Sequence, residues 1–383
     1  MLTDISAEMV ATILPLYLVF SLGASPLVLG AIDGLYRGAA AIVQLGGGFL
    51  SDRLQRHKEI AGVGYGLSAL TKVGLVVAGS SVGAIGALVV ADRVGKGMRT
   101  APRDALISLS STKAGLATAF GVHRAMDSAG AMLGPLIAFG VLLVAPARFD
   151  AVFVVSTLFA LLGLAVLVLA VQGRPARAAQ AVRELPSTRE ALGVLRDRRF
   201  RLLLLATGGL ALASVSDALI YVGLQERSGF EPTVFPLLFV AAALVFMALA
   251  IPVGRLADRV GRVPVLLGGY AMLLPVYVLL LSPVGTTGLC FALVALGAYF
   301  AATEGVSAAL AGAILPAESQ GTGMGMLVTV MSIGKFGSSL AFGGLWFALG
   351  LQGAVLVFGA ALVAVLAIAT PLLLGTQREP LGE

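Results

Sequence analysis

Charged residues are scarce in this sequence. Only 12% of its 383 residues are Asp, Glu, Lys or Arg, whereas 58% are hydrophobic. An ordinary soluble domain carries about 25% charged residues, so the composition excludes that class of protein. The mean hydropathy of +0.99 indicates instead a chain that crosses a membrane many times.

Cysteine is almost absent, because Cys290 is the only one in the chain. A single cysteine excludes a disulfide within the chain, and the sequence contains no zinc-ligand spacing. It also lacks a Walker-type phosphate loop and a nucleophile elbow. We therefore expect a protein without cofactor or metal that is not an enzyme.

The N-terminus lacks the basic region of a cleaved signal peptide. It carries two acids, Asp4 and Glu8, within its first apolar run. We therefore expect this run to be a first membrane span and not a cleaved signal.

Lys and Arg are unevenly distributed, although their total of 26 against 20 acids gives a basic pI near 9.7. With the spans predicted below, most lie in connections on one side of the membrane and only Arg148 and Arg227 lie in connections on the other. This asymmetry follows the positive-inside rule and predicts that the basic side is cytoplasmic. We expect a multi-pass protein of the cell inner (plasma) membrane with both termini cytoplasmic, and no nucleic-acid partner.

Apolar windows of about 20 residues predict twelve transmembrane helices. Their approximate ranges are 3–22, 27–50, 60–79, 83–108, 114–144, 151–171, 201–224, 233–254, 263–281, 287–313, 321–348 and 353–373. The polar stretch 172–200 contains seven arginines. It is predicted to be a cytoplasmic linker between an N-terminal bundle, 1–171, and a C-terminal bundle, 201–383.

The two halves share an internal repeat. The stretch from Gly48 to Arg56 matches the stretch from Gly254 to Arg262 at an offset of 206 residues. A second, shorter match relates Thr118–Gly121 to Thr322–Gly325 at an offset of 204. A repeat of this length with six spans per copy is typical of the parallel duplication of a secondary transporter.

Three motifs carry a resemblance to a known family. The stretch Gly254–Arg262 reads Gly-x-x-x-Asp-Arg-x-Gly-Arg, which resembles the signature of the major facilitator superfamily. Its first copy has Gln55 where the signature has glycine. Arg93-Val-Gly-Lys-Gly97 resembles the element associated with proton coupling, and Gly130-Ala-Met-Leu-Gly-Pro135 resembles the element of exporters that work as antiporters.

The resemblance covers essentially the whole chain. It implies an all-α membrane protein of twelve transmembrane helices in two pseudo-symmetric six-helix bundles, working as a monomer by alternating access. Charges at the membrane edge would stabilise a gate, and the fifth helix would combine close packing with a bend. The predicted gating residues are Asp52, Arg53, Arg56, Asp258, Arg259, Arg262, Gly130, Gly134 and Pro135.

The fourth predicted helix carries an unusual number of charges. Six of its side chains fall within one stripe, roughly 140° wide, on an ideal helix. Each charge at the centre of a bilayer costs on the order of 2.5–3.5 kcal/mol, so this stripe must face partners or a water-filled cavity. The six residues are Asp92, Arg93, Lys96, Arg99, Arg103 and Asp104.

Intramembrane charge is concentrated in the first half of the chain. The spans of the second half contain only Asp217, Glu304 and Lys335. In the superfamily, the third, sixth, ninth and twelfth helices form an outer scaffold. Lys72 is the only charged residue within these four predicted spans, and its side chain would either snorkel or pair with another helix. We infer a central cavity with one basic, polar wall and one apolar wall, which suits an amphipathic solute with a polar or anionic end.

Residues that would face this cavity are predicted substrate ligands. Asp33 and Arg37 lie four positions apart on one helix face, and they form either a permanent ion pair or part of the binding site. Tyr221 shares a polar stripe of the seventh helix with Ser214 and Asp217. The predicted substrate-binding residues are Asp33, Arg37, Arg93, Lys96, Arg124, Tyr221 and Lys335.

Carboxylates without a basic neighbour on their own helix are predicted proton carriers. Asp4 and Glu8 lie four positions apart, and two carboxylates at that spacing in a low dielectric do not easily both ionise. Asp217 and Glu304 have no basic residue three or four positions away. A histidine and an acid four apart on the fifth helix form either a satisfied interior pair or a further proton site. The predicted proton-coupling residues are Asp4, Glu8, Asp217, Glu304, Asp127 and His123.

These features favour a secondary active transporter. The specific prediction is proton-coupled antiport that exports a small amphipathic organic molecule, with protons and membrane lipid as further partners. A proton from outside would protonate a cavity carboxylate, release the substrate and favour return of the carrier. The alternatives are a flippase for lipid or glycolipid headgroups and a non-transporting membrane sensor.

Overall fold

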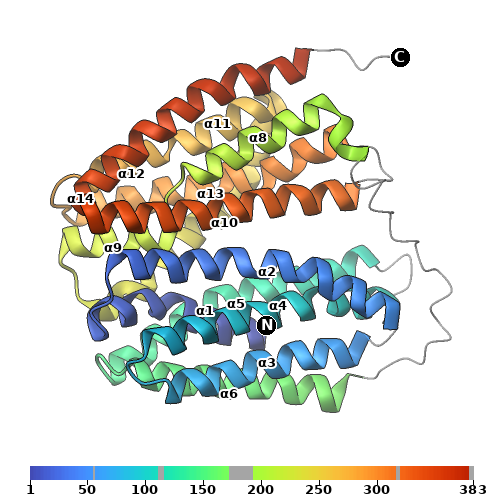
Figure 1. Cartoon of the computed structure of the whole chain (residues 1–383), viewed down its shortest axis with the longest axis vertical. Helices are drawn as coiled ribbons and strands as arrows, with labels where there is room; N and C mark the ends of the chain where they lie inside the picture. Colours follow the sequence, from blue (N-terminus) through green and yellow to red (C-terminus); the bar gives the residue numbers. More distant parts are fainter. Residues whose placement is uncertain (55–56, 111–115, 172–192, 316–319, 379–383) are drawn as a thin grey trace. The chain divides into compact units, whose positions relative to one another are not determined.

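The fold is taken from a computed structural model of the chain. The structure describes residues 1–54, 57–110, 116–171, 193–315 and 320–378, although not every side chain within them. Throughout these ranges the regular elements are helices, as Figure 1 shows. The expectation of an all-α protein is confirmed.

The chain forms two compact units. Each unit contains one run of consecutive helices, and α2 and α10 belong partly to each. The first unit holds α1 (Leu2–Leu16), the π-helix η1 (Tyr17–Ser21), most of α2 (Pro26–Leu54), α3 (His57–Val77), α4 (Val82–Ser110), α5 (Leu116–Val144), α6 (Phe149–Ala170) and the 3-10 turn η4 (Pro232–Val234). The second holds the 3-10 turn η3 (Val194–Arg196), α8 (Arg198–Leu212), α9 (Asp217–Ser228), most of α10 (Phe235–Val260), α11 (Arg262–Ala271), α12 (Leu273–Leu279), α13 (Thr286–Ile314) and α14 (Gln320–Arg378).

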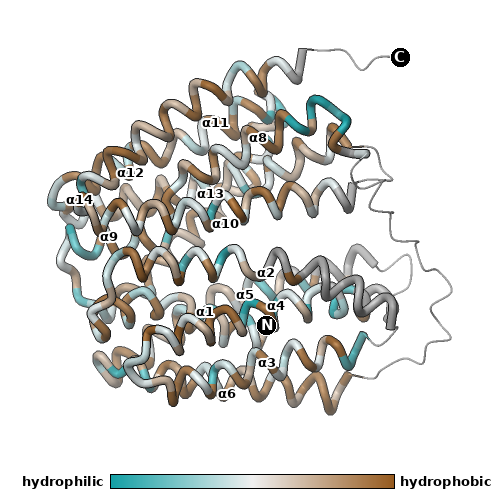
Figure 2. The backbone as a smooth tube through the Cα atoms, in the orientation of Figure 1, coloured by the Kyte–Doolittle hydropathy of each residue, from teal (hydrophilic) through white to brown (hydrophobic). Residues whose placement is uncertain are grey.

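Nine segments of the described chain are long and apolar enough to cross a membrane. One of them, Gly323–Gly375, holds two spans, because Gly350 interrupts α14 with a φ of 73°. Helices α2 and α4 have 29 residues each, which is also enough to cross a bilayer. The total agrees with the twelve spans predicted. In Figure 2, much of the described chain is coloured as hydrophobic.

The seventh predicted span, 201–224, lies within one apolar segment, Arg198–Ser228, but its helix is not continuous. Helix α8 ends at Leu212 and α9 begins at Asp217. The polar stripe that we predicted on this span therefore does not lie on one continuous helix face, because its first member, Ser214, lies in the break.

Side chains satisfy the backbone where this span is broken. The N–H of Val215 donates to the hydroxyl of Tyr277 at 2.8 Å, and the carbonyl of Ser214 accepts a hydrogen bond from Ser338. The hydroxyl of Ser216 accepts from a backbone N–H in the first turn of α9 at 3.3 Å. These contacts replace the helical hydrogen bonds that a break removes, so apolar surroundings tolerate it.

Helices α2 and α10 each begin in one unit and continue in the other. Residues 25–34 belong to the second unit and residues 231–240 belong to the first. A shift of 206 residues maps one range onto the other, and the same offset relates the two copies of the signature motif. The packing of the chain therefore repeats the internal symmetry of its sequence.

The first residues of α2 pack closely on α14 inside the second unit. A Cβ on Gly30 would lie 2.9 Å from the Cα of Gly343 and closer still to the carbonyl oxygen of Ser339. One turn later, the buried carboxylate of Asp33 accepts a hydrogen bond from the hydroxyl of Ser339 at 2.6 Å. Asp33 therefore has a partner on α14 that its spacing to Arg37 did not indicate.

Candidate functional site

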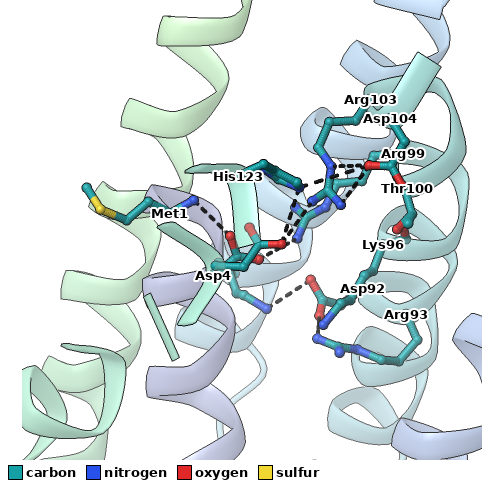
Figure 3. A network of polar contacts seen from close by, with 12 residues as sticks. Met1, Asp4, Asp92, Arg93, Lys96, Arg99, Thr100, Arg103, Asp104 and His123 are labelled. Carbon is teal, nitrogen blue, oxygen red and sulfur yellow. Dashed lines mark hydrogen bonds and ion pairs between the residues drawn. The ribbon is translucent and has the colours of Figure 1, made fainter. Parts of the chain in front are cut away.

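The charged side chains of α4 meet partners from other helices of the first unit, and Figure 3 shows this network from close by. Asp92, Arg93 and Arg99 are only 5%, 3% and 3% exposed, so their partners decide whether burying their charge is tolerable. We call the whole set the charge ladder. Its members are Asp4, Glu8, Lys72, Asp92, Arg93, Lys96, Arg99, Arg103, Asp104, His123 and Asp127.

The most buried level of the ladder joins α3 to α4. The ammonium of Lys72 lies 2.9 Å from one carboxylate oxygen of Asp92, and the guanidinium of Arg93 lies 2.5 Å from the other. The guanidinium also stacks 3.9 Å above the ring of Tyr36 on α2. The expectation that Lys72 pairs with another helix is confirmed, and Asp92 neutralises part of two buried cations.

Lys96 and Glu8 form the next level, between α4 and α1. The two side chains interact electrostatically, and Glu8 also interacts with Arg93 and Tyr36. Neither Glu8 nor Lys96 makes a direct ion pair with any residue that the structure describes. The Nε of Arg93 is likewise buried with no hydrogen-bond acceptor among the described residues. This level therefore leaves polar groups without a hydrogen-bond partner among the described residues. The level that contains His123 does so too, at the Nε2 of His123 and at one carboxylate oxygen of Asp127.

Arg99 and Asp4 form the third level. The guanidinium lies 4.0 Å from the Asp4 carboxylate and 4.7 Å from the ring centre of Tyr65 on α3. The amino group of Met1 also lies 2.9 Å from Asp4. The order of the contacts, with Asp4 beside Arg99 and Glu8 beside Lys96, shows that α1 runs antiparallel to α4.

The last level joins α4 to α5 and contains the histidine. Arg103 lies 3.1 Å from Asp104 and 4.0 Å from Asp127. The Nε2 of His123 lies 3.2 Å from Asp127 and 4.0 Å from Asp104. Two carboxylates therefore share one guanidinium and one imidazole.

Helix α5 supports the α1 side of the ladder through two glycines. A Cβ on Gly130 would lie 3.0 Å from the Cβ of Asp4, and one on Gly134 would lie 2.7 Å from the Cβ of Glu8. Any larger residue would push against the backbone of α1 as well, because the carbonyl of Ile5 is 2.9 Å from the same point at Gly134. These two glycines fix the depth at which both carboxylates sit.

The sequence of this chain is similar to those of known proteins. The model of the Major Facilitator Superfamily matches residues 1–334 and 211–383. The chain belongs to the major facilitator superfamily. It is 36% identical over 163 residues to an uncharacterised MFS-type transporter of Methanocaldococcus jannaschii, a match that spans 43% of this chain and only 40% of that relative.

Solved structures of low identity share the superfamily fold. The nucleoside transporter NupG superposes with a TM-score of 0.79 at 13% identity, over 97% of this chain and 96% of that one. A bacterial homologue of the human lysosomal transporter Spinster superposes with a TM-score of 0.78 at 15% identity, over 99% of this chain and 96% of that one. The chain is therefore a multi-pass membrane protein of a transporter family, and the predicted fold is confirmed.

The acids and bases of the charge ladder are equal in number. The described ladder contains five acids and five permanently basic residues, besides His123. Most of these charges neutralise one another, so the ladder does not form a surplus of positive charge. Asp4 and Glu8 each have a cation from α4 nearby, because Arg99 lies beside Asp4 and Lys96 interacts with Glu8. Their role as proton carriers stays a prediction.

The predicted residues of the second unit lie on α9, α13 and α14. Asp217 is the first residue of α9, where its carboxylate accepts from the N–H of Ala218 at 3.0 Å. Tyr221 is only 1% exposed, whereas Glu304 on α13 is exposed and Lys335 on α14 is half-buried. Their roles in proton coupling and substrate binding stay predictions, as does that of the half-buried Arg37 in the first unit.

The second copy of the signature motif contacts α13 through Arg262, and its gating role stays a prediction. Arg262 lies 3.5 Å from Asp258 and donates a hydrogen bond to the carbonyl of Ala309 on α13 at 3.0 Å, while Arg259 is exposed. In α5, Pro135 is buried and the helix continues through it. The side chains of Asp52, Arg53, Arg56 and Arg124 lie outside the part of the chain that the structure describes.

The charged stripe of α4 could be predicted from the sequence, but the aromatic partners of its arginines could not. The charges on α4 were visible from their helical spacing. No spacing relates Tyr36 to Arg93, or Tyr65 to Arg99, because these contacts join different helices. A tyrosine in an apolar segment carries no signal that distinguishes a cation partner from an ordinary core residue.

Proposed function

We propose that this superfamily member is a proton-coupled antiporter that exports a small amphipathic organic molecule with a polar end, by alternating access. The observation that carries the proposal is the environment of Glu8. Its carboxylate interacts with Lys96 and Arg93 but makes no direct ion pair among the described residues. Such a carboxylate is available either to a proton or to a polar group of the substrate.

Antiport follows if the proton and the substrate exclude each other at Glu8. The ionised carboxylate would bind substrate on the cytoplasmic side, and protonation from outside would remove the charge that holds it. The proton would then leave as the next substrate binds. A ligand can drive such a cycle only by binding one facing state more tightly than the other, which the shared site allows.

His123 and Asp127 would exchange protons at the other end of the ladder. Their 3.2 Å contact lies beside Arg103, which is 4.0 Å from Asp127. Uptake of a proton by His123 would place a second cation beside Asp127. The rearrangement would reach α1 through the glycine contacts of α5 beneath Asp4 and Glu8.

The test is transport by purified protein in proteoliposomes that contain a pH-sensitive dye. A panel of amphipathic solutes is screened for solute-dependent proton movement, and the active solute is then used for counterflow without a pH gradient. E8Q should lose the response to an imposed gradient and retain counterflow exchange. The matched control is E226Q, which changes an exposed glutamate at the end of α9 and should stay coupled.

Two results would overturn this proposal. Full gradient-driven transport by E8Q would show that protons do not act through Glu8. Movement of a labelled phospholipid between leaflets by the wild-type protein, with no response to the solutes or to a pH gradient, would favour the flippase instead.

A further inference from the structure

Three polar groups of the charge ladder converge without a direct partner among the residues that the structure describes. They are the carboxylate of Glu8, the ammonium of Lys96 and the Nε of Arg93. Arg93 is only 3% exposed, and its Nε has no acceptor among the described residues. A buried donor without an acceptor is costly, so it marks a place where a ligand oxygen would be stabilised.

Helix geometry brings these groups to one level of the first unit. The Asp4–Arg99 contact at 4.0 Å sets the register of α1 on α4. From there, Glu8 lies about 6 Å along α1, and Lys96 lies about 4.5 Å back along the antiparallel α4. Glu8 interacts electrostatically with Lys96, Arg93 and Tyr36, in agreement with this register.

The neighbouring charges are already matched to one another. Asp92 lies between Lys72 and Arg93, Asp4 lies beside Arg99, and the remaining pair of acids shares Arg103. A ligand at the Glu8 level therefore meets one negative group and two positive ones, within a ladder that has little net charge left. A purely anionic ligand would leave Glu8 uncompensated, and a purely cationic ligand would leave Lys96 uncompensated.

We propose that this level is a subsite for a zwitterion, in which Glu8 binds an ammonium group and Lys96 together with the Nε of Arg93 binds a carboxylate. The proposal rests on the proposed transport function and narrows its substrate class from a polar or anionic end to an amino-carboxylate headgroup. The ammonium of the substrate then competes with the proton for Glu8, as antiport requires.

Arg93 is held in place before any ligand arrives. Asp92 binds one of its terminal nitrogens at 2.5 Å, and Tyr36 stacks on the guanidinium plane at 3.9 Å. These two contacts fix the direction of Nε, so little conformational freedom is lost when a carboxylate binds there. Lys96 has no such contact and can adjust to ligands of different length.

The test uses ω-amino carboxylates from β-alanine to aminooctanoate, with the fatty acids and alkylamines of the same lengths as matched probes. Binding to the purified full chain in detergent is measured by ligand-dependent thermal stabilisation. At the best chain length, the amino-carboxylate should bind about tenfold or more tightly than either singly charged probe. E8Q should abolish the preference over the fatty acid, and K96Q should abolish the preference over the alkylamine.

R148Q is the control, because Arg148 pairs with Asp150 at an exposed position away from the ladder. It should retain both preferences. The zwitterion proposal fails if the fatty acid binds the wild-type protein as tightly as the amino-carboxylate, if no chain length is preferred over its singly charged probes, or if E8Q keeps the preference. Proton coupling is measured separately in proteoliposomes. Proton-coupled transport of simple anions would contradict only the zwitterion subsite. Transport of amino-carboxylates without proton coupling would contradict only the proposal of antiport.

Discussion

Glu8 on α1 and Gly134 on α5 are in direct contact, since a Cβ added to Gly134 would lie 2.7 Å from the Cβ of Glu8. This contact ties the helix with the antiporter-like motif to a carboxylate of the charge ladder. The glycine is therefore needed for space and not for an unusual backbone conformation.

The first prediction concerns this contact. G134A should force α1 and α5 apart, which costs about 1–3 kcal/mol by analogy with overpacked cores, and should slow transport by displacing Glu8. Thermal unfolding in detergent and transport in proteoliposomes measure the two effects. G140A on the same helix is the control, because a Cβ at Gly140 would meet no heavy atom of the described chain within 4 Å. Equal behaviour of both variants would contradict the packing argument.

A second prediction concerns the break between α8 and α9. The hydroxyl of Tyr277 accepts from the N–H of Val215 at 2.8 Å, whereas the hydroxyl of Tyr270 is buried without a partner among the described residues. Y277F should therefore destabilise the protein by about 1–3 kcal/mol, since it leaves a buried backbone N–H unsatisfied. Y270F removes a hydroxyl that bonds nothing in the described chain and should be neutral or stabilising. Thermal unfolding of the two variants in one detergent compares them; a larger loss for Y270F would contradict the assignment of these hydrogen bonds.

Apolar periodicity and motif spacing predicted the helices of this protein well, because the length of a span and the mean polarity of a segment are local properties. The break at residues 213–216 could not be predicted in that way. Its sequence, Ala-Ser-Val-Ser, differs little from the adjoining turns, and its backbone is satisfied by Tyr277 and Ser338, which are distant in the chain. Tertiary partners therefore override the local pattern there.

The candidate site was only half predictable for the same reason. Residues on one helix, such as His123 and Asp127, were correctly paired from their spacing of four. The pairing of charges between helices depends on register and depth, which sequence spacing does not contain. Asp4 is a predicted proton carrier because no basic residue lies near it on α1, yet Arg99 of α4 lies beside it.

A third prediction tests the orientation in the membrane. The arrangement of Lys and Arg predicts that the linker near Ser187 is cytoplasmic and that the connection after α5, which contains the exposed Ala147, faces outside. Single cysteines at these two positions, in a C290A background, should show opposite accessibility to an impermeant thiol reagent in intact cells. Labelling of both from outside would contradict the topology.

The last prediction concerns the Lys72–Asp92 pair, the most buried ion pair between two described helices. Lys72 is 3% exposed and its ammonium lies 2.9 Å from Asp92, which also binds Arg93. Removing one partner of a buried pair typically costs about 3–5 kcal/mol when it leaves a charge without compensation. In K72M, Arg93 still compensates Asp92, so K72M should lower the thermal stability by less than this. K58M is the control, because Lys58 on the same helix is hydrogen-bonded to the carbonyl of Val168 at an exposed position.

The D92N variant distinguishes a structural pair from a general sensitivity of α3 and α4. It leaves Lys72 and Arg93 close together without a carboxylate, so it should be at least as damaging as K72M. The double variant K72M/D92N no longer buries an unpaired ammonium, and its loss should be clearly smaller than the sum of the two single losses. Additive losses in a double-mutant cycle would show that Lys72 and Asp92 act independently. In that case the cation needed by Asp92 would be Arg93 alone, and Lys72 would contribute to stability only through its packing.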